Sequence, residues 1–284
     1  MGLGGAGQRL ASRAKAHGRV SAARHRAPPP GGGAAVTQPA GRGMALSLVA
    51  HSFQLDEVVT IAASTAPPLR APFLDLRFAC AHVDSLAARQ GPGIYGIFFG
   101  EPDAERHLIY VGSYRGTKAD RFGGDVADAR WWKHAATLTM RGNSVSIARK
   151  TWGWAETLAE GDAFRVLAKN SGILKKAGCD AGMNRVLFAH RHWSMLSEAK
   201  PDGLRSLFLI SYLRVARDDA RVPTGLDTSR LLRSILLAEN AVIRELRPAC
   251  NYQVAWGSSR TDVTKEAFES EARAKLEPLL TPDP

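Results

Sequence analysis

Residues 93–112 read GIYGIFFGEPDAERHLIYVG, and this stretch decides the fold. Ile94–Phe99 and His107–Val111 are apolar runs made largely of residue types that favour β-strands. Gly100–Asp103 between them has the composition of a turn. Two strands joined by a short turn form an antiparallel hairpin, so we expect a hairpin here.

The position of the turn predicts the register of this hairpin. Opposite residues of an antiparallel pair have a constant number sum, so a turn centred near residues 102–103 places Tyr95 opposite Tyr110. Tyrosine is common in strands, and each of the two could be an ordinary sheet residue. A pair on one face beside Gly96 and Gly112 is less ordinary, because glycine lets other groups approach the backbone closely.

The rest of the chain predicts helices around this hairpin. A strand is expected over Leu207–Val215. Hydrophobic spacing predicts helices over Ala79–Arg89, Ala129–Met140, Arg185–Leu196, Leu226–Leu246 and Thr264–Leu280. The fold class is therefore α+β: a small antiparallel sheet of three or more strands flanked by helices.

Four segments organise the 284 residues. We expect a disordered Gly/Ala/Arg/Pro-rich segment over 1–43, an N-terminal extension over 44–90, a catalytic or binding domain over 91–255 with a helical insertion at about 141–203, and a surface helix and tail over 256–284. The first segment fits a basic nucleic-acid arm, a transit peptide or a misassigned start, and the ordinary sequence after Met44 favours the last.

Charge and composition restrict the functional classes. The formal net charge is +11, but residues 1–55 hold 7 of the 38 Lys and Arg and none of the 27 Asp and Glu, which leaves 31 − 27 = +4 for the remainder. A mildly basic net charge for residues 56–284 is compatible with a polyanionic partner. Three widely spaced cysteines without a CxxC pair suggest a reducing, cytoplasmic setting. No apolar run is long enough for a membrane span, so we expect no membrane partner.

Glu239 is the strongest single indication of chemistry. It interrupts the apolar stripe of the Leu226–Leu246 helix, between Ile235 and Ile243. A carboxylate facing a core is costly unless it is paired, hydrogen-bonded or bound to a cation. A buried ion pair would satisfy it. The functional alternative is a Mg²⁺ (or Mn²⁺) ligand, because such ions often take only one or two protein carboxylates and complete their shell with water and phosphate.

Three further polar residues fit phosphate chemistry. Arg130 and His134 lie four residues apart on the Ala129–Met140 helix and so share a face. A guanidinium matches phosphate oxygens, and an imidazole relays protons, although both are also common as structural helix residues. Asn251 follows the Leu226–Leu246 helix and is expected either to orient Glu239 or to pin the backbone.

Taken in order, these residues resemble the GIY-YIG nuclease family. The motifs are Gly93-Ile94-Tyr95, Tyr110-Val111-Gly112, Arg130 with His134, Glu239 and Asn251. The resemblance implies a GIY-YIG-like fold and a metal-dependent endonuclease that hydrolyses phosphodiester bonds, more often of DNA than of RNA. It implies Tyr95, Tyr110, Arg130, His134, Glu239 and Asn251 as site residues, Glu239 as the metal ligand, and Mg²⁺ or Mn²⁺ as cofactor.

Two long intervals depart from the family pattern. The interval from Tyr110 to Arg130 makes Arg121 a rival for the catalytic arginine, and Arg130 is preferred because His134 follows one helical turn later. The interval from His134 to Glu239 is explained by the insertion, whose basic residues and tryptophans suit either nucleic-acid contact or an ordinary helical layer. The alternative function is a non-catalytic nucleic-acid-binding module that retains the fold.

Overall fold

A computed structural model describes most of the chain beyond residue 45. The described residues are 46–63, 76–81, 86–141, 181–217, 228–251, 253–255 and 257–280. The chain divides into two compact units, Met1–Arg42 and Gly43–Pro284, and every described residue belongs to the second. The expectations for residues 1–43 and for most of the insertion, including all of 142–180, lie outside the described residues.

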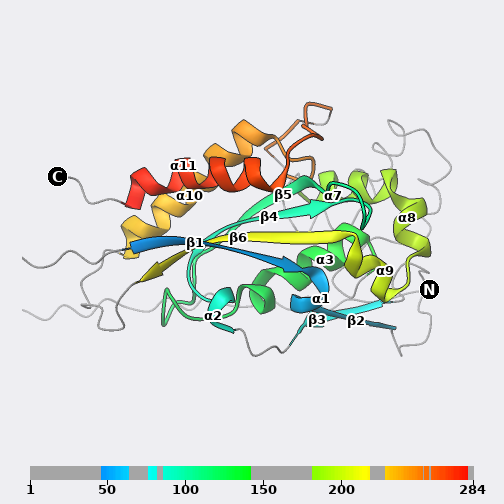
Figure 1. Cartoon of the computed structure of the whole chain (residues 1–284), viewed down its shortest axis with the longest axis horizontal. Helices are drawn as coiled ribbons and strands as arrows, with labels where there is room; N and C mark the ends of the chain where they lie inside the picture. The colour runs from blue at the N-terminus through cyan, green and yellow to red at the C-terminus, as the bar shows by residue number, and fades with distance from the viewer. Residues whose placement is uncertain are drawn as a thin grey trace, which may run out of the picture. The chain divides into compact units, whose positions relative to one another are not determined.

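A four-stranded antiparallel sheet forms the centre of the second unit (Figure 1). Its strand order is β1-β6-β4-β5. The strands are β1 (Leu46–Gln54), β4 (Gly93–Phe99), β5 (His107–Tyr114) and β6 (Phe208–Arg217). A second, two-stranded sheet pairs β2 (Val59–Ala63) with β3 (Leu76–Cys80). The expected α+β class with an antiparallel sheet is confirmed at this level.

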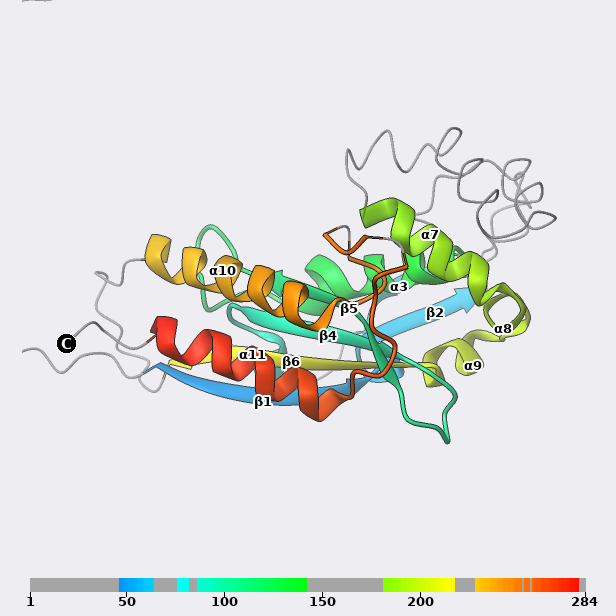
Figure 2. The same cartoon turned by 90° about the horizontal axis from the view of Figure 1, so that it is seen from above.

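Helices lie on both faces of the central sheet. They are α1 (Leu55–Val58), α2 (Leu86–Arg89), the π-helical turn η2 (Ala127–Trp131), α3 (Trp132–Thr139), α7 (Ala181–Arg191), α8 (Trp193–Glu198), α9 (Pro201–Ser206), α10 (Thr228–Leu246) and α11 (Lys265–Leu280). In Figure 1, α10 and α11 lie on one side of the sheet, and η2 with α3 lies on the other. Figure 2 shows α10 and α11 running beside each other.

The period-two alternation of the strands divides the core into two layers. Ile94 and Phe98 of β4 face α10 and α11 and pack with Phe268 of α11. Tyr95 and its neighbours on the opposite face pack with Trp131 of η2. All seven residues of β4 are buried, because helices cover both faces of this central strand.

The hairpin forms as expected, but its register is two residues away from the prediction. Tyr95 lies opposite Gly112, and Tyr110 lies opposite Ile97. A bulge then leaves Ile109 as an extra residue on β5. An even shift keeps every side chain on its expected face, so both tyrosines still share one face of the sheet.

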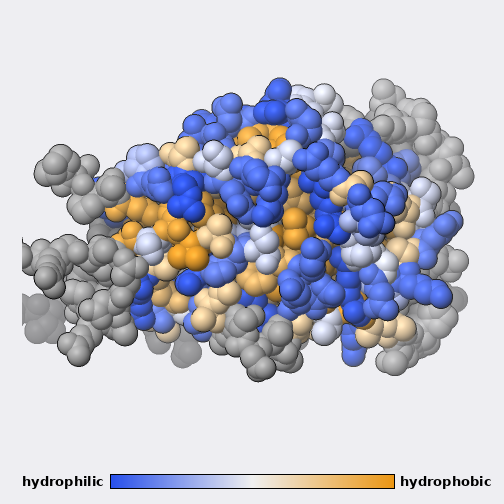
Figure 3. Space-filling model, viewed as in Figure 1, coloured by the Kyte–Doolittle hydropathy of each residue, from blue (hydrophilic) through white to orange (hydrophobic). Residues whose placement is uncertain are grey.

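Two other expectations differ from the structure. The predicted helix over Ala79–Arg89 is wrong at its start, because Ala79 and Cys80 belong to β3 and only Leu86–Arg89 is helical. The C-terminal helix does more than cover the surface. Phe268 and Leu276 of α11 are fully buried against the sheet, while in Figure 3 hydrophilic residues cover the outer side of this helix. None of the described helices is long and apolar enough to span a lipid bilayer.

Candidate active site

Three rings from three elements meet on the η2–α3 side of the sheet. Tyr95 of β4, Tyr110 of β5 and His134 of α3 have ring centroids between 4.9 and 6.3 Å apart. The hydroxyl of Tyr95 lies 2.8 Å from Nε2 of His134, so the two side chains share a hydrogen bond. Tyr95 is only 1% exposed, and the edge of Trp131 packs against its ring. The bond therefore holds the half-buried imidazole against the buried Tyr95 ring.

Gly112 provides the space in which the Tyr95 side chain lies. A Cβ atom on Gly112 would lie 2.5 Å from the Tyr95 hydroxyl oxygen and 2.9 Å from a ring carbon of Tyr110. Side chains do not tolerate separations of this size. The glycine of the second tripeptide is thus required by the tyrosine of the first, which is a physical reason for the two to occur together.

Burial keeps both partners of the hydrogen bond uncharged. The pKa of Tyr95 is raised well above its ordinary value, chiefly by burial and further by nearby Tyr110 and Glu239. Burial also lowers the pKa of His134 well below 6.5, and the positive charges of Arg185 and Arg130 add to this effect. For Tyr95, burial thus outweighs the lowering effect of Arg185 and Arg130 on its pKa.

Arg130 lies at the exposed border of the ring cluster. It belongs to the π-helical turn η2, and such turns are frequent at functional sites. Its side chain is exposed, and its positive charge acts on Tyr95, Tyr110, His134 and Glu239. Its rival, Arg121, lies in the loop that precedes η2. The electrostatic influence of Arg130 on these four groups favours it over Arg121 as the arginine of the site.

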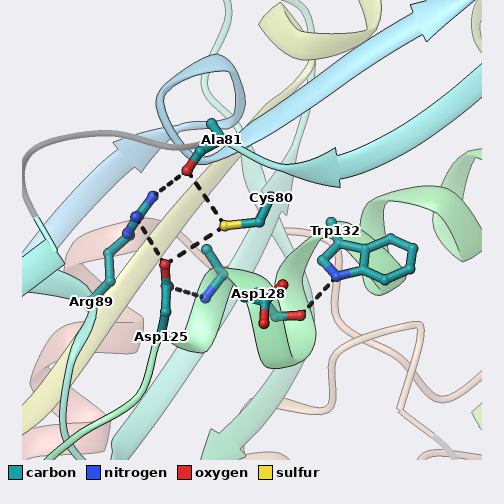
Figure 4. Close-up of polar contacts among 7 residues, drawn as sticks. Cys80, Ala81, Arg89, Asp125, Asp128 and Trp132 are labelled. Atoms are coloured by element: carbon teal, nitrogen blue, oxygen red, sulfur yellow. Dashed lines mark hydrogen bonds and ion pairs between the residues drawn. The ribbon is translucent and has the colours of Figure 1, made fainter.

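A buried ion pair fixes the start of the helix that carries Arg130 and His134 (Figure 4). Arg89 lies 2.8 Å from Asp125, and their side chains are 3% and 16% exposed. Arg89 also donates to the carbonyl of Ala81, and Asp125 accepts a hydrogen bond from the backbone N–H of Ala127. The carboxylate therefore caps the first turn while the arginine ties it to the end of β3.

Glu239 approaches the edge of β5 from the other side of the sheet. Its Oε2 accepts a 2.6 Å hydrogen bond from the hydroxyl of Ser113, and the Ser113 backbone donates to the carboxylate as well. Burial raises the pKa of Glu239, and the Ser113 hydrogen bond, Arg115 and Arg130 oppose this rise. Within the described ranges, no Lys or Arg forms an ion pair with Glu239. The alternative of a buried ion pair is therefore not what satisfies this carboxylate.

Asn251 pins the backbone of β5, the second of the two roles expected for it. Its side-chain amide accepts from the N–H of Val111 at 2.8 Å and donates to the Val111 carbonyl at 2.7 Å. One residue earlier, the N–H of Cys250 donates to the carbonyl of Ile109. Both polar groups of Val111 are thereby satisfied on the open edge of the strand, and the edge is held next to Glu239.

Arg185 is a member of the site that sequence reasoning missed. Its guanidinium lies 4.5 Å from the centre of the Tyr110 ring and donates to the Thr137 hydroxyl at 3.2 Å. It comes from α7, which packs against α3. The sequence placed Arg185 among the basic residues of the insertion, and no local pattern could indicate that α7 returns to the ring cluster.

The structure therefore brings five of the six expected site residues around Gly112. The sixth, Asn251, hydrogen-bonds the backbone of β5 at Val111. Within the described part of the chain, no group of three or more His, Cys, Asp or Glu side chains could hold a metal ion. No protein-family model, curated protein or solved structure matches this chain.

Proposed function

We propose that this protein is a metal-dependent endonuclease of the GIY-YIG type that hydrolyses phosphodiester bonds of nucleic acid, with DNA as the preferred substrate. One observation carries the proposal. A Tyr95–His134 hydrogen bond, the exposed Arg130 and the half-buried Glu239 converge from both sides of the sheet on the edge of β5. A proton-accepting pair, a phosphate-binding cation and a carboxylate ligand are the groups that phosphodiester hydrolysis requires.

Glu239 fits a divalent metal that a substrate helps to hold. Ser113 donates to the Glu239 carboxylate from its hydroxyl and its backbone N–H, and within the described ranges no Lys or Arg neutralises this carboxylate in an ion pair. A single carboxylate suits Mg²⁺ or Mn²⁺, which keep several waters and take phosphate oxygens as further ligands. When bound, such an ion would polarise the phosphate and stabilise the leaving oxygen.

Tyr95 and His134 would act together on the attacking water. Because the phenol keeps its proton and the imidazole is neutral, the pair can pass a proton inward. Water gives its proton to the Tyr95 oxygen while the phenol gives its own to Nε2 of His134. One P–O bond forms and the opposite P–O bond breaks; the leaving oxygen takes a proton from solvent, which leaves a phosphomonoester and a free hydroxyl, and His134 later returns its proton to solvent.

Arg130 would bind the phosphate and also assist the histidine. A guanidinium offsets the negative charge that develops on phosphate oxygens. In the free protein its positive charge helps to lower the pKa of His134. An entering phosphodiester anion would compensate this charge, so His134 would become a better proton acceptor once substrate is bound.

Cleavage of supercoiled plasmid by the full-length chain tests the proposal. Glu239→Gln is the informative variant, because glutamine still accepts the Ser113 hydrogen bond but lacks the charge that binds a metal. Glu245→Gln is the matched control, since Glu245 is an exposed glutamate on the same helix. We expect wild type and Glu245→Gln to nick the plasmid with Mg²⁺ or Mn²⁺, and Glu239→Gln to be slower by about a hundredfold or more.

Three other outcomes of the cleavage assay would each contradict one part of the proposal. Equal cutting by Glu239→Gln and wild type would assign Glu239 to holding Ser113 rather than to a metal. Cutting that persists in a chelator would refute metal dependence. A wild-type protein that binds DNA and RNA but cuts neither would be the non-catalytic nucleic-acid-binding module.

A further inference from the structure

We propose that Arg185, supplied by α7, is a second phosphate-binding residue of this site and contacts the nucleic-acid backbone beside Tyr110. The inference rests on the proposed function for its ligand class, a phosphodiester. It adds a residue that comes from the insertion rather than from the hairpin, α3 or α10.

The first reason is the charge balance around Arg185. The guanidinium is hydrogen-bonded to the hydroxyl of Thr137 and lies against Tyr110, with which it also shares a side-chain hydrogen bond; both partners are uncharged. Its Nε is buried and has no hydrogen-bond partner, and none of the described carboxylates forms an ion pair with it. A partly buried cation without a counter-ion is costly, and an entering anion would remove that cost.

The second reason is the fixed orientation of the side chain. The Tyr110 ring supports one face of the guanidinium. Thr137 fixes one of its terminal nitrogens, and the Thr137 hydroxyl itself is hydrogen-bonded to backbone carbonyls of α3 at 3.0 Å. An arginine held by stacking has lost most of its conformational freedom before substrate arrives, which favours phosphate binding.

The third reason is the position of Arg185 relative to the proposed proton relay. Its positive charge acts on Tyr110, Tyr95 and His134. The phosphate that it binds would therefore lie near the rings, on the same side of the sheet as Arg130. Two arginines from different elements, Arg130 of η2 and Arg185 of α7, would then bind the nucleic-acid backbone near the ring cluster.

The salt dependence of DNA binding tests this role. A fluorescein-labelled duplex of about 20 base pairs is titrated with the full-length chain in Ca²⁺, and the logarithm of the binding constant is plotted against that of the salt concentration. Losing one phosphate contact reduces the slope by about 0.9. Arg185→Met keeps the apolar stem and removes the charge, so we expect the slope to fall by about one unit.

Two variants serve as controls. Arg273→Met removes the same charge from α11 on the other side of the sheet, where Arg273 is paired with Glu277, and should leave the slope unchanged. Arg185→Lys keeps a cation and should keep the wild-type slope while weakening binding, because lysine lacks the two-pronged geometry. A merely structural role would lower the melting temperature of Arg185→Met without changing its slope.

The outcomes separate this inference from the proposed nuclease activity. A wild-type slope in Arg185→Met, or an equal decrease in Arg273→Met, overturns the role of Arg185 even if wild type cuts DNA. A reduced slope in Arg185→Met alone supports the role even if wild type binds without cutting. Failure of wild type to bind the duplex overturns both.

Discussion

Replacing Gly112 by alanine should both destabilise the protein and displace Tyr95. The added Cβ would lie 2.5 Å from the Tyr95 hydroxyl oxygen and 2.6 Å from the ring carbon that carries it. Ordinary contact requires 3.4 Å or more, so the ring must move by about an ångström within a packed core. Overpacking of this kind costs about 1–3 kcal/mol, and we expect about 2 kcal/mol.

Thermal and urea unfolding of Gly112→Ala measure this cost. A loss of about 2 kcal/mol lowers the melting temperature by about 4–8 °C for a domain of this size. Gly203→Ala is the matched control, because its Cβ would meet only the Ala199 Cβ at 3.6 Å. It lies in the short helix α9, where alanine should stabilise by about 0.5–1 kcal/mol.

A second variant separates the steric explanation from a general effect on β5. Tyr95→Phe removes the hydroxyl oxygen that makes the closest contact, so the Gly112→Ala substitution should cost less in a Tyr95→Phe background than in wild type. If Gly112→Ala is as stable as wild type, or if the two substitutions are additive, Gly112 is not what makes room for Tyr95.

Three further predictions concern the residues that hold the site. Asn251→Ala leaves both buried polar groups of Val111 unpaired and should cost about 2–4 kcal/mol in urea unfolding; an unchanged midpoint would contradict this. Arg89→Met leaves Asp125 without its buried partner and should cost about 3–5 kcal/mol, whereas a cost below 1 kcal/mol would show that the pair is dispensable. Burial keeps native His134 neutral, so below about pH 6.5 only the unfolded state takes up a proton at this residue. Between pH 7.5 and 5.5 the free energy of unfolding of wild type should therefore fall by about 1 kcal/mol more than that of His134→Gln. Parallel curves of unfolding free energy against pH for the two proteins would refute this.

The local parts of the fold could be predicted because they depend on neighbouring residues. The expected helix over Leu226–Leu246 differs from α10 by two residues at its start and ends at the same residue. In contrast, β1 (Leu46–Gln54) was not expected, since its Ala-His-Ser-centred sequence has a weak apolar pattern. It forms because it pairs along its length with β6, more than 150 residues away.

In the candidate site, too, features that depend on neighbouring residues could be predicted, whereas features that depend on distant segments could not. Tyr95 and Tyr110 reach one face because the alternation of a strand survives an even register error, although the bulge at Ile109 was not foreseeable. Arg185 needed knowledge of which helix packs against α3, and its spacing in the sequence carries no such information. The pKa of Tyr95 depends on burial by distant segments, so its direction could not be read from its charged neighbours.

The bonds along the open edge of β5 have a consequence for aggregation. A bare edge strand is a template on which another chain can add a strand and start a fibril. Here Cys250, Asn251 and Glu239 occupy the outward backbone groups of Ile109, Val111 and Ser113. A foreign strand would have to break these bonds before it could pair, so the segment that completes the site also protects the protein from misassembly at this edge.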